Sequence, residues 1–306
     1  MNQIRLLFFL FYFVCFEVIA VYGQQYVDLA RITSSITPQN SFDSSQTSTF
    51  VRENVSDITL PLKLNDSLAI VTGLLYENLY AKTTERSTAY TSAHGITLKV
   101  GLNFTHNERW KSTFVFMPKL SSDLKRVNSN DFQFGGSILV KYKKSDFFTW
   151  QFGGYYNGEL FGPFFVPFLG MYYHSPNQRF EANVLLPASV DMNYSFTPKL
   201  RLGGSFVSFV KTFHIHEQSG PSPTSYWNKS TNEIFAYLQV EPVRGLLIQG
   251  RAGYSVARRF TMYDSADKIS FAIMAFKFED DRTRNNQWFA DGGIFQLRLI
   301  YRYYLD

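Results

Sequence analysis

Residues 293–306 read GIFQLRLIYRYYLD, and apolar and polar side chains alternate through this stretch almost without interruption. Successive side chains of a β-strand point to opposite faces, so the stretch predicts a strand with one apolar face and one polar, cationic face. The apolar face carries Phe295, Leu297, Leu299, Tyr301, Tyr303 and Leu305. The other face carries Gln296, Arg298, Ile300, Arg302 and Tyr304. Such a strand is typical of a transmembrane β-barrel, where alternate residues face the lipid and the lumen.

The same alternation recurs at 96–105, 132–143, 148–157 and 246–257, and no helical period is visible after residue 50. We therefore predict an all-β fold, a closed antiparallel transmembrane β-barrel. The aromatic residues expected on its lipid face include Phe148, Trp150, Phe152, Phe295, Tyr301 and Tyr303. The charged residues expected to line its lumen are Lys99, Lys141, Lys143, Glu181, Asp191, Arg201, Arg251, Arg298 and Arg302.

The longest alternating stretch is 180–196, which keeps apolar residues at the even positions. About ten residues are enough for a strand to cross a bilayer, so a single strand here would extend beyond it. Pro187 interrupts the stretch and donates no ladder hydrogen bond, which predicts a bulge or a bend. If the bend is a full turn, the stretch is two short strands.

The connections between the alternating stretches fall into two classes. Short, turn-like connections follow residues 64, 143, 197 and 242, and longer polar stretches lie at 83–93, 121–130, 217–230 and 279–291. Outer-membrane barrels have short turns on the periplasmic side and long loops outside. We expect an even number of strands, about 12 and within 10–14. The weakest strand is at 164–174, where Pro163 and Pro167 break the pattern.

The composition agrees with a barrel. The chain of 306 residues has 31 Phe and 19 Tyr, and charged residues make up only 18% of it. Beyond the first residues, no run of about 18 apolar side chains is present that would form a membrane-spanning helix. Apolar residues spread over alternating strands suit a barrel, although a soluble, secreted β-sandwich or adhesin shares much of the pattern.

The N-terminal residues have the features of a secretory signal peptide. Arg5 precedes an apolar stretch at 6–16, and Val21 and Gly23 supply small residues for cleavage after position 23. We predict a signal peptide at 1–23, a periplasmic segment at 24–48 and an outer-membrane barrel at 49–306. Cys15 is the only cysteine, so the mature chain would have no disulfide bond.

Several short motifs resemble an uncharacterised family of outer-membrane β-barrels that is common in Bacteroidetes and is described as a domain of unknown function. The motifs are ITLPL at 58–62, WQFGGY at 150–155, VPFLGMYY at 166–173, VLLP at 184–187, MNY at 192–194 and YRY at 301–303. The resemblance implies a bacterial outer-membrane barrel, and it implies no catalytic or ligand-binding residues.

The sequence offers little support for catalysis or metal binding. His214 and His216 share a face of one strand, which suits a metal pair, but no third ligand can be assigned. His174 and Ser175 are adjacent and would point apart on a strand. We therefore assign no catalytic, cofactor-binding or metal-binding residues, and an enzyme acting on lipid or cell-wall material is kept as the alternative. The net charge of +5 comes without a run of like charges, so no nucleic-acid partner is expected.

The charges expected in the lumen support two interpretations. They can form a cation-lined passage that favours anionic solutes, or a salt-bridged and largely closed interior. In either case we expect an integral barrel in the bacterial outer membrane that acts as a passive channel or as a binding barrel for small solutes or hydrophobic molecules. Its expected partners are outer-membrane lipid and the barrel-assembly machinery.

Overall fold

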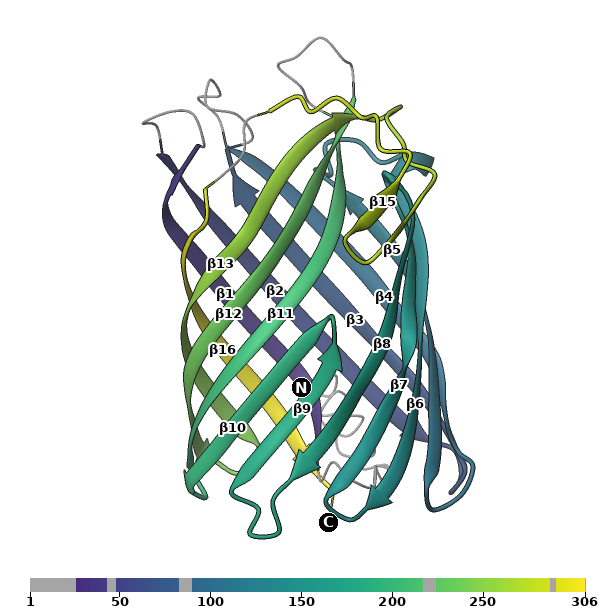
Figure 1. Cartoon of the computed structure of the whole chain (residues 1–306), viewed down its shortest axis with the longest axis vertical. Coiled ribbons are helices and arrows are strands. Elements are labelled where there is room, and N and C mark those ends of the chain that lie inside the picture. The colour runs from purple at the N-terminus through teal and green to yellow at the C-terminus, as the bar shows by residue number, and fades with distance from the viewer. Residues whose placement is uncertain (1–25, 43–47, 83–89, 217–223, 287–289, 306) are drawn as a thin grey trace, which may run out of the picture.

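The computed structural model describes residues 26–42, 48–82, 90–216, 224–286 and 290–305, and the predicted signal peptide lies outside them. Within this part of the chain there are sixteen strands and one short 3-10 helix (Figure 1). They are β1 (Tyr26–Ser41), β2 (Ser48–Lys63), β3 (Leu68–Ala81), β4 (Thr91–Thr105), β5 (Trp110–Ser122), η1 (Ser129–Asp131), β6 (Phe132–Ser145), β7 (Phe148–Glu159), β8 (Gly162–His174), β9 (Phe180–Leu186), β10 (Ser189–Thr197), β11 (Leu200–Ile215), β12 (Ser225–Val243), β13 (Leu246–Asp264), β14 (Phe271–Ile273), β15 (Phe276–Phe278) and β16 (Gly292–Tyr304). No helix in these ranges has the length and apolar character needed to cross a membrane.

Fourteen of the strands, β1–β13 and β16, form a closed antiparallel barrel. Each pairs with its neighbour in the chain, β8 pairs with β9, and β1 pairs with both β2 and β16, so the sheet has no first or last strand. The prediction of a closed barrel with an even number of strands is confirmed, and 14 lies at the upper limit of the predicted range. β14 and β15 form a small hairpin beside β8.

The short connections and both ends of the wall lie at one end of the barrel, at the bottom of Figure 1, which we call the lower end. Tyr26 at the start of β1 pairs with Tyr304 at the end of β16. The predicted short turns join β2 to β3, β6 to β7, β10 to β11 and β12 to β13 at this end. The longer connections at 123–131 and 265–286 lie at the opposite, upper end (Figure 1). Part of the stretch predicted as a loop at 217–230 is instead strand, because β12 begins at Ser225.

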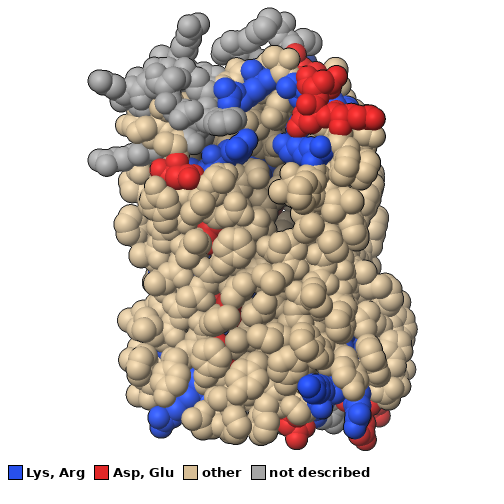
Figure 2. All heavy atoms as spheres, in the orientation of Figure 1, with Lys and Arg blue, Asp and Glu red and all other residues tan. Residues whose placement is uncertain are grey.

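The outward face of the wall is apolar, as the alternation predicts. Phe295, Leu297 and Tyr301 on β16 are 54%, 62% and 53% exposed, whereas Ile300 and Arg302 point inward and are buried. Trp150, Phe152 and Tyr303 are also exposed, and Phe148 is half-buried against Trp150. Figure 2 shows a broad belt of uncharged side chains, with most of the visible charges gathered near the two ends. A belt of this kind matches the hydrocarbon layer of a membrane.

Residues 24–48 were predicted to be a periplasmic segment outside the barrel, and this was wrong for most of them. Residues Tyr26–Ser41 form β1, which is hydrogen-bonded into the wall on both sides. The inward residues of β1 include Thr33 and Ser35, and its outward apolar residues are few, such as Ile32 and Ile36. The two faces of β1 therefore differ little in hydropathy, because one carries small polar residues and the other carries few apolar ones. For this reason the alternation in this strand was not recognised.

The stretch 180–196 is two strands, which was the alternative left open by its proline. β9 and β10 are joined by a turn at Pro187 and Ala188 and run antiparallel, with Val190 opposite Val184 and Tyr194 opposite Phe180. This hairpin reaches only part of the way up the wall (Figure 1).

The stretch 164–174 was predicted to be a strand, the weakest of the wall, and it is a strand. It lies in β8, which pairs with β7 over its whole length. Pro163 and Pro167 are tolerated because the other edge of β8 has no β9 neighbour there, since the β8–β9 ladder covers only Leu169–His174.

Candidate functional site

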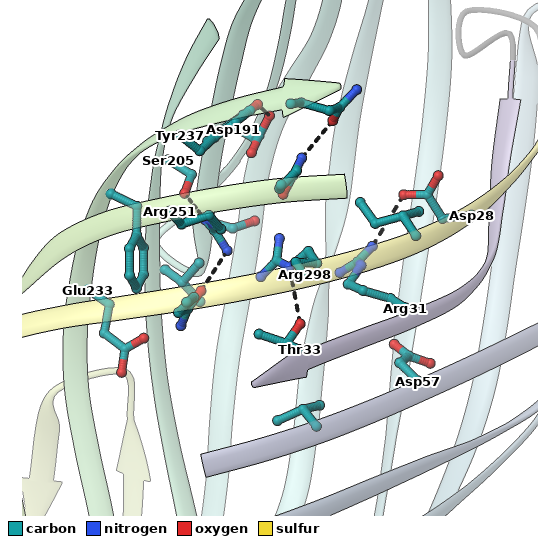
Figure 3. A pocket seen from close by; sticks show the side chains of 18 of the residues that line it. Asp28, Arg31, Thr33, Asp57, Asp191, Ser205, Glu233, Tyr237, Arg251 and Arg298 are labelled. Atoms are coloured by element: carbon teal, nitrogen blue, oxygen red, sulfur yellow. Dashed lines mark hydrogen bonds and ion pairs between the residues drawn. The ribbon is translucent and has the colours of Figure 1, made fainter. Parts of the chain in front are cut away.

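A polar chamber of about 430 Å³ lies inside the barrel and is the candidate site (Figure 3). Inward-facing side chains from β1–β3, β9–β13 and β16 line it. Seven of the lining residues are acidic: Asp28, Glu53, Asp57, Glu77, Glu181, Asp191 and Glu233. Six are basic: Arg31, Arg201, Lys211, Arg251, Arg298 and Arg302. The chamber is therefore nearly balanced in charge rather than cationic.

Most of the charged residues selected from the sequence lie in this chamber. Glu181, Asp191, Arg201, Arg251, Arg298 and Arg302 line it together. The three lysines lie nearer the lower end. Lys141 lines a smaller cavity of about 220 Å³ beside Asp28 and Asp57, and Lys99 forms an ion pair with Asp57. Lys143 reaches the lower turn, where its Nζ is 2.6 Å from an oxygen of Asp146.

Five of the seven acids and two of the six bases were not identified from the sequence. Asp28 and Arg31 were missed because β1 was not recognised as a strand. Lys211 lies on β11 in the same alternating set as Arg201, so counting in steps of two from Arg201 would have found it.

The inward charges are held by one another and by hydroxyl, amide and aromatic groups. Arg302 donates from Nε to Asp28 Oδ1 at 2.7 Å, and its guanidinium lies over the Tyr26 ring, 3.4 Å from the centroid. Arg251 donates to Gln296 Oε1 at 2.9 Å and also to the Ser205 hydroxyl.

Two further charges of the chamber are partnered in the same way. Arg298 Nε donates to Thr33 Oγ1 at 3.1 Å, and the Tyr237 hydroxyl donates to Asp191 at 2.8 Å. These contacts favour the salt-bridged interpretation of the interior over a cation-lined passage.

The upper end of the barrel is filled by apolar side chains from inside. The upper parts of β11–β13 lean inward, and Phe213, Trp227 and Phe260 are almost completely buried against the upper ends of β1–β4. Their partners in this cluster are Phe42, Val51, Leu79, Ala81, Ala93, Ile215 and Met262. We call this set the upper plug.

The infolded strands are covered on both faces. Tyr226 and Trp227 are consecutive on β12, so they point to opposite faces, yet neither is exposed. Tyr226 packs in a second cluster with Phe161, Phe164 and Tyr263. A strand of the wall would leave one of these faces in lipid, so this part of β12 lies inside the molecule.

Ion pairs join the infolded strands to the opposite wall. Lys211 on β11 pairs with Glu77 on β3, and Lys229 on β12 pairs with Glu53 on β2. Because these pairs connect residues on different sides of the lumen, they narrow the route from the chamber to the upper end.

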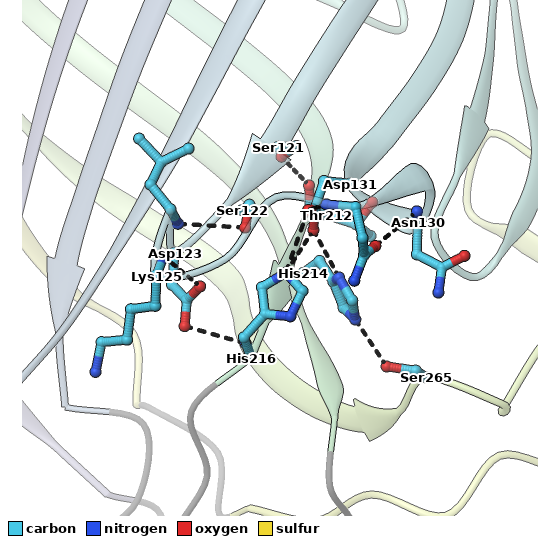
Figure 4. A network of polar contacts seen from close by, with 12 residues as sticks. Ser121, Ser122, Asp123, Lys125, Asn130, Asp131, Thr212, His214, His216 and Ser265 are labelled. Carbon is cyan, nitrogen blue, oxygen red and sulfur yellow. Dashed lines mark hydrogen bonds and ion pairs between the residues drawn. The ribbon is translucent and has the colours of Figure 1, made fainter.

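A compact polar cluster ties β11 to the connection between β5 and β6 (Figure 4). His214 Nδ1 lies 2.7 Å from Asp131 Oδ1, and His216 Nε2 lies 2.9 Å from the same oxygen. Ser265 Oγ lies 3.2 Å from His214 Nε2. We call these four residues the rim cluster. Asp131, on the single-turn helix η1, is the third group that the sequence could not identify, because it is 83 residues from His214.

The rim cluster has two chemical capabilities besides holding the fold together. A carboxylate and two imidazoles whose ligand atoms all lie within 4.8 Å of one another form a donor set suited to zinc. Ser265, His214 and Asp131 are also hydrogen-bonded in series, as in a serine hydrolase. Ser265 lines neither the chamber nor the cavity beside Lys141.

The electrostatics of Asp131 favour its charged form. Burial alone would raise the pKa of this carboxyl, but hydrogen bonds from the Asn128 amide and from both histidines outweigh burial and lower the pKa below its ordinary value.

Comparisons with known proteins give one family match. The model of a family described as "Domain of unknown function (DUF6268)" matches residues 21–285. No curated protein matches the chain.

Solved structures similar to this chain include three from Pseudomonas species. The first is an outer membrane channel from Pseudomonas putida F1, with 10% identity, a TM-score of 0.43 and coverage of 93% of this chain and 98% of that one. The second is the P. putida toluene transporter TodX, with 8% identity, a TM-score of 0.40 and coverage of 90% and 89%. The third is a FadL homologue from Pseudomonas aeruginosa, with 11% identity, a TM-score of 0.39 and coverage of 90% of each chain.

Proposed function

The chain belongs to the DUF6268 family, and from the geometry of its own residues we propose that it is an integral channel of the bacterial outer membrane. The observation that carries this proposal is a closed β-barrel with an apolar outer belt and a polar chamber inside it. Only helices and closed barrels satisfy every backbone polar group within a bilayer, and a polar lumen behind an apolar exterior is the arrangement of a membrane barrel.

The chamber is the binding compartment of this channel, and the upper plug is its closed gate. A small solute fits the chamber volume, and its polar groups would exchange hydrogen bonds with side chains such as Gln239, Gln249 and Asn193. Passage to the upper end requires Trp227 and its neighbours in the upper plug to move. The channel is therefore closed at rest.

Reconstitution tests this proposal. We expect proteoliposomes containing the wild-type chain to take up L-arabinose slowly, and the variant Trp227→Ala/Phe260→Ala to take it up at least several-fold faster, because both large side chains leave the plug. Leu238→Ala/Leu297→Ala, which truncates two exposed side chains of the outer belt, is the matched control. The proposal fails if the plug variant migrates as a folded barrel on unheated gels and still admits no more sugar than protein-free vesicles.

Further expectations concern the protein in the cell. The lower end, where β1 starts and β16 ends, faces the periplasm, and the outer belt contacts outer-membrane lipid. A signal peptide at 1–23 would direct export, the barrel-assembly machinery would insert the chain, and no nucleic acid would bind. We also expect the family to be common in Bacteroidetes. Cell fractionation after removal of residues 1–23 tests the export signal.

A hydrolase is the second candidate function, favoured by the rim cluster alone. Ser265 would be the nucleophile, His214 the general base, and Asp131 the group that orients the imidazole. A fluorophosphonate probe would then label the wild-type chain at Ser265 and leave Ser265→Ala unlabelled. Absence of labelling in the folded wild-type protein removes this candidate.

A further inference from the structure

The barrel wall is incomplete on one side. The β8–β9 ladder covers Leu169–His174, and the β10–β11 ladder covers Leu200–Val207. Above these ladders β8 and β11 do not pair with each other, because the β9–β10 hairpin ends at Pro187 and Ala188 (Figure 1). On this side β11 next meets a barrel strand near its upper end, where His214 lies opposite Ser122 of β5. The upper half of the wall between β8 and β11 is therefore open.

A cavity of about 620 Å³ occupies this opening, which we call the window. Its lower border is the tip of the β9–β10 hairpin, its sides are β8 and β11, and its upper border is the turn at Met274 and Ala275 between β14 and β15. The Met274 amide donates to the Phe165 carbonyl at 2.9 Å, so this turn takes part of the place that β9 leaves empty. In Figure 2 the same face of the molecule is hollowed above the hairpin.

Several backbone groups at the edges of the window are hydrogen-bonded, and two amide hydrogens are absent because the residues are prolines. The Phe165 carbonyl points toward the window, so the odd-numbered residues of this part of β8 direct their backbone groups there. Pro163 and Pro167 are odd-numbered and have no amide hydrogen to offer at this edge. On the other side the Ser208 amide donates to the Ala188 carbonyl at 2.8 Å, and the Thr212 amide donates to Glu159.

The window lies at the level of the outer belt. Exposed apolar side chains flank it on the outside, with Phe165 43% and Leu169 58% exposed on β8 and Leu186 51% exposed on the hairpin. Charged residues would be expected at this position if the window opened to water. The flanking residues therefore place its mouth against the hydrocarbon layer.

The lining of the window changes from apolar to polar with depth. Phe164, Val166, Phe206 and Met274 supply apolar surface near the wall. On β12 the outward residues Leu238 and Ile234 are exposed and apolar, but the next outward positions, Asn232 and Ser230, line the window instead. The polar side chains that β12 presents to the window are suited to a ligand with a polar group.

The window adjoins the chamber. Leu75, Glu77, Phe209 and Lys211 line both cavities. The Glu77–Lys211 ion pair lies between the two cavities, and Lys119 and Glu159 add two further charged side chains to the lining of the window.

We propose that the window is a binding site and lateral entrance for a small amphiphile, with an alkyl or aryl body and a hydrogen-bonding head, that moves between the membrane and the chamber. The inference rests on the proposed membrane location and deepens the proposed function by naming a substrate class. The apolar body lies against β8 and β11, and the head reaches Ser230, Asn232 and the Glu77–Lys211 pair.

Photolabelling tests the window. The full chain is reconstituted in liposomes that contain palmitic acid carrying a diazirine, irradiated, and mapped by peptide mass spectrometry. We expect labels on Phe164 and Phe206 as well as on Phe295 of the outer belt. In Ala188→Trp/Ala275→Trp, which fills the window, labelling of Phe164 and Phe206 falls about tenfold, equivalent to roughly 1.4 kcal/mol of binding, while labelling of Phe295 is unchanged.

Two controls keep the test decisive. Ala252→Trp adds the same side chain to the exposed outer face of β13 and leaves window labelling as in the wild type. If the filled variant does not fold, Ser208→Cys is folded first and then blocked with a bulky maleimide, and the unblocked protein serves as its reference.

The outcomes separate this inference from the proposed function. Labelling confined to outer-belt residues such as Phe295, or labelling of Phe164 that the filled variant retains, overturns the window even if arabinose uptake behaves as proposed. If labelling of Phe164 and Phe206 is lost in the filled variant, the window is supported even if arabinose is never taken up. In that case the proposed solute channel fails and the amphiphile site remains supported.

Discussion

At the scale of single residues, the interior is a set of charges whose partners come from distant parts of the chain. Arg302 and Asp28 are 274 residues apart and meet at the seam between β16 and β1. Alternation alone predicts that Arg302 points inward, since a strand has a period of two. It cannot predict the partner, because pairing depends on how the sheet closes.

Removing one member of this pair should be costly. Asp28→Ala leaves the buried Arg302 guanidinium without its carboxylate, and we expect a loss of about 3 kcal/mol in the free energy of unfolding. Urea unfolding in vesicles measures it. Asp66→Ala, which breaks the exposed pair with Lys63 in a lower turn, is the matched control and should leave the unfolding curve unchanged. Equal effects of the two variants would contradict the buried role of Arg302.

The rim cluster makes stability depend on pH. A carboxylate whose pKa is lowered by folding stabilises the protein while it is ionised, so the contribution of Asp131 is fully present above the ordinary aspartate pKa of about 4. It is lost as the pH falls below that value. We expect the thermal midpoint of the wild type to drop between pH 5 and pH 3 by about two degrees more than that of Asp131→Asn. Parallel curves for the two proteins would show that Asp131 contributes nothing.

At the scale of elements, the stretch 180–196 shows where sequence patterns stop being informative. In the β9–β10 hairpin, residues of equal parity face each other, such as Val184 and Val190. The even positions therefore stay on one face through the turn, and a hairpin has the same alternation as one long strand. Pro187 was the only local sign of the turn. β1 was missed for the opposite reason, because its two faces differ too little in hydropathy.

Close packing between neighbouring strands gives an element-scale prediction. A Cβ atom added at Gly153 on β7 would clash with the Ile138 carbonyl oxygen on β6, whereas one added at Gly250 on β13 would meet nothing within 4 Å. We expect Gly153→Ala to cost about 1–3 kcal/mol. Gly250→Ala should be neutral or stabilise by about 0.5 kcal/mol. The stability of each variant is measured as the temperature at which its folded band is lost on gels. A neutral Gly153→Ala would contradict the close approach of β6 and β7.

At the scale of the whole molecule, the barrel and its apolar belt followed from composition and alternation, and the even strand number followed from the general rule for outer-membrane barrels. The upper plug and the balanced chamber did not. Both depend on where the upper ends of β11–β13 lie, and Phe213 or Trp227 has the same local pattern whether it faces a lumen or a packed core. The alternation of a strand shows only which face a side chain is on. Whether that face meets a lumen, lipid or a packed core depends on how the strands close in three dimensions.

The balance of charge in the chamber predicts weak ion selectivity. With seven acidic and six basic side chains lining it, the chamber opened by Trp227→Ala/Phe260→Ala should give a reversal potential near zero in a potassium chloride gradient. Adding Arg31→Gln/Arg298→Gln removes two positive charges and should shift the potential toward cation selectivity. Strong anion selectivity before that change would restore the cation-lined interpretation of the interior.

The seam between β1 and β16 has a consequence for biogenesis. The ladder that closes the ring joins residues about 270 positions apart, while the ladders between consecutive strands join neighbours in the chain. Until the ribosome has made β16, β1 carries an open edge that any other nascent strand can capture. The free edge of β1 disappears only when β16 pairs with it, so an unclosed chain is exposed to strand capture and the completed ring is not.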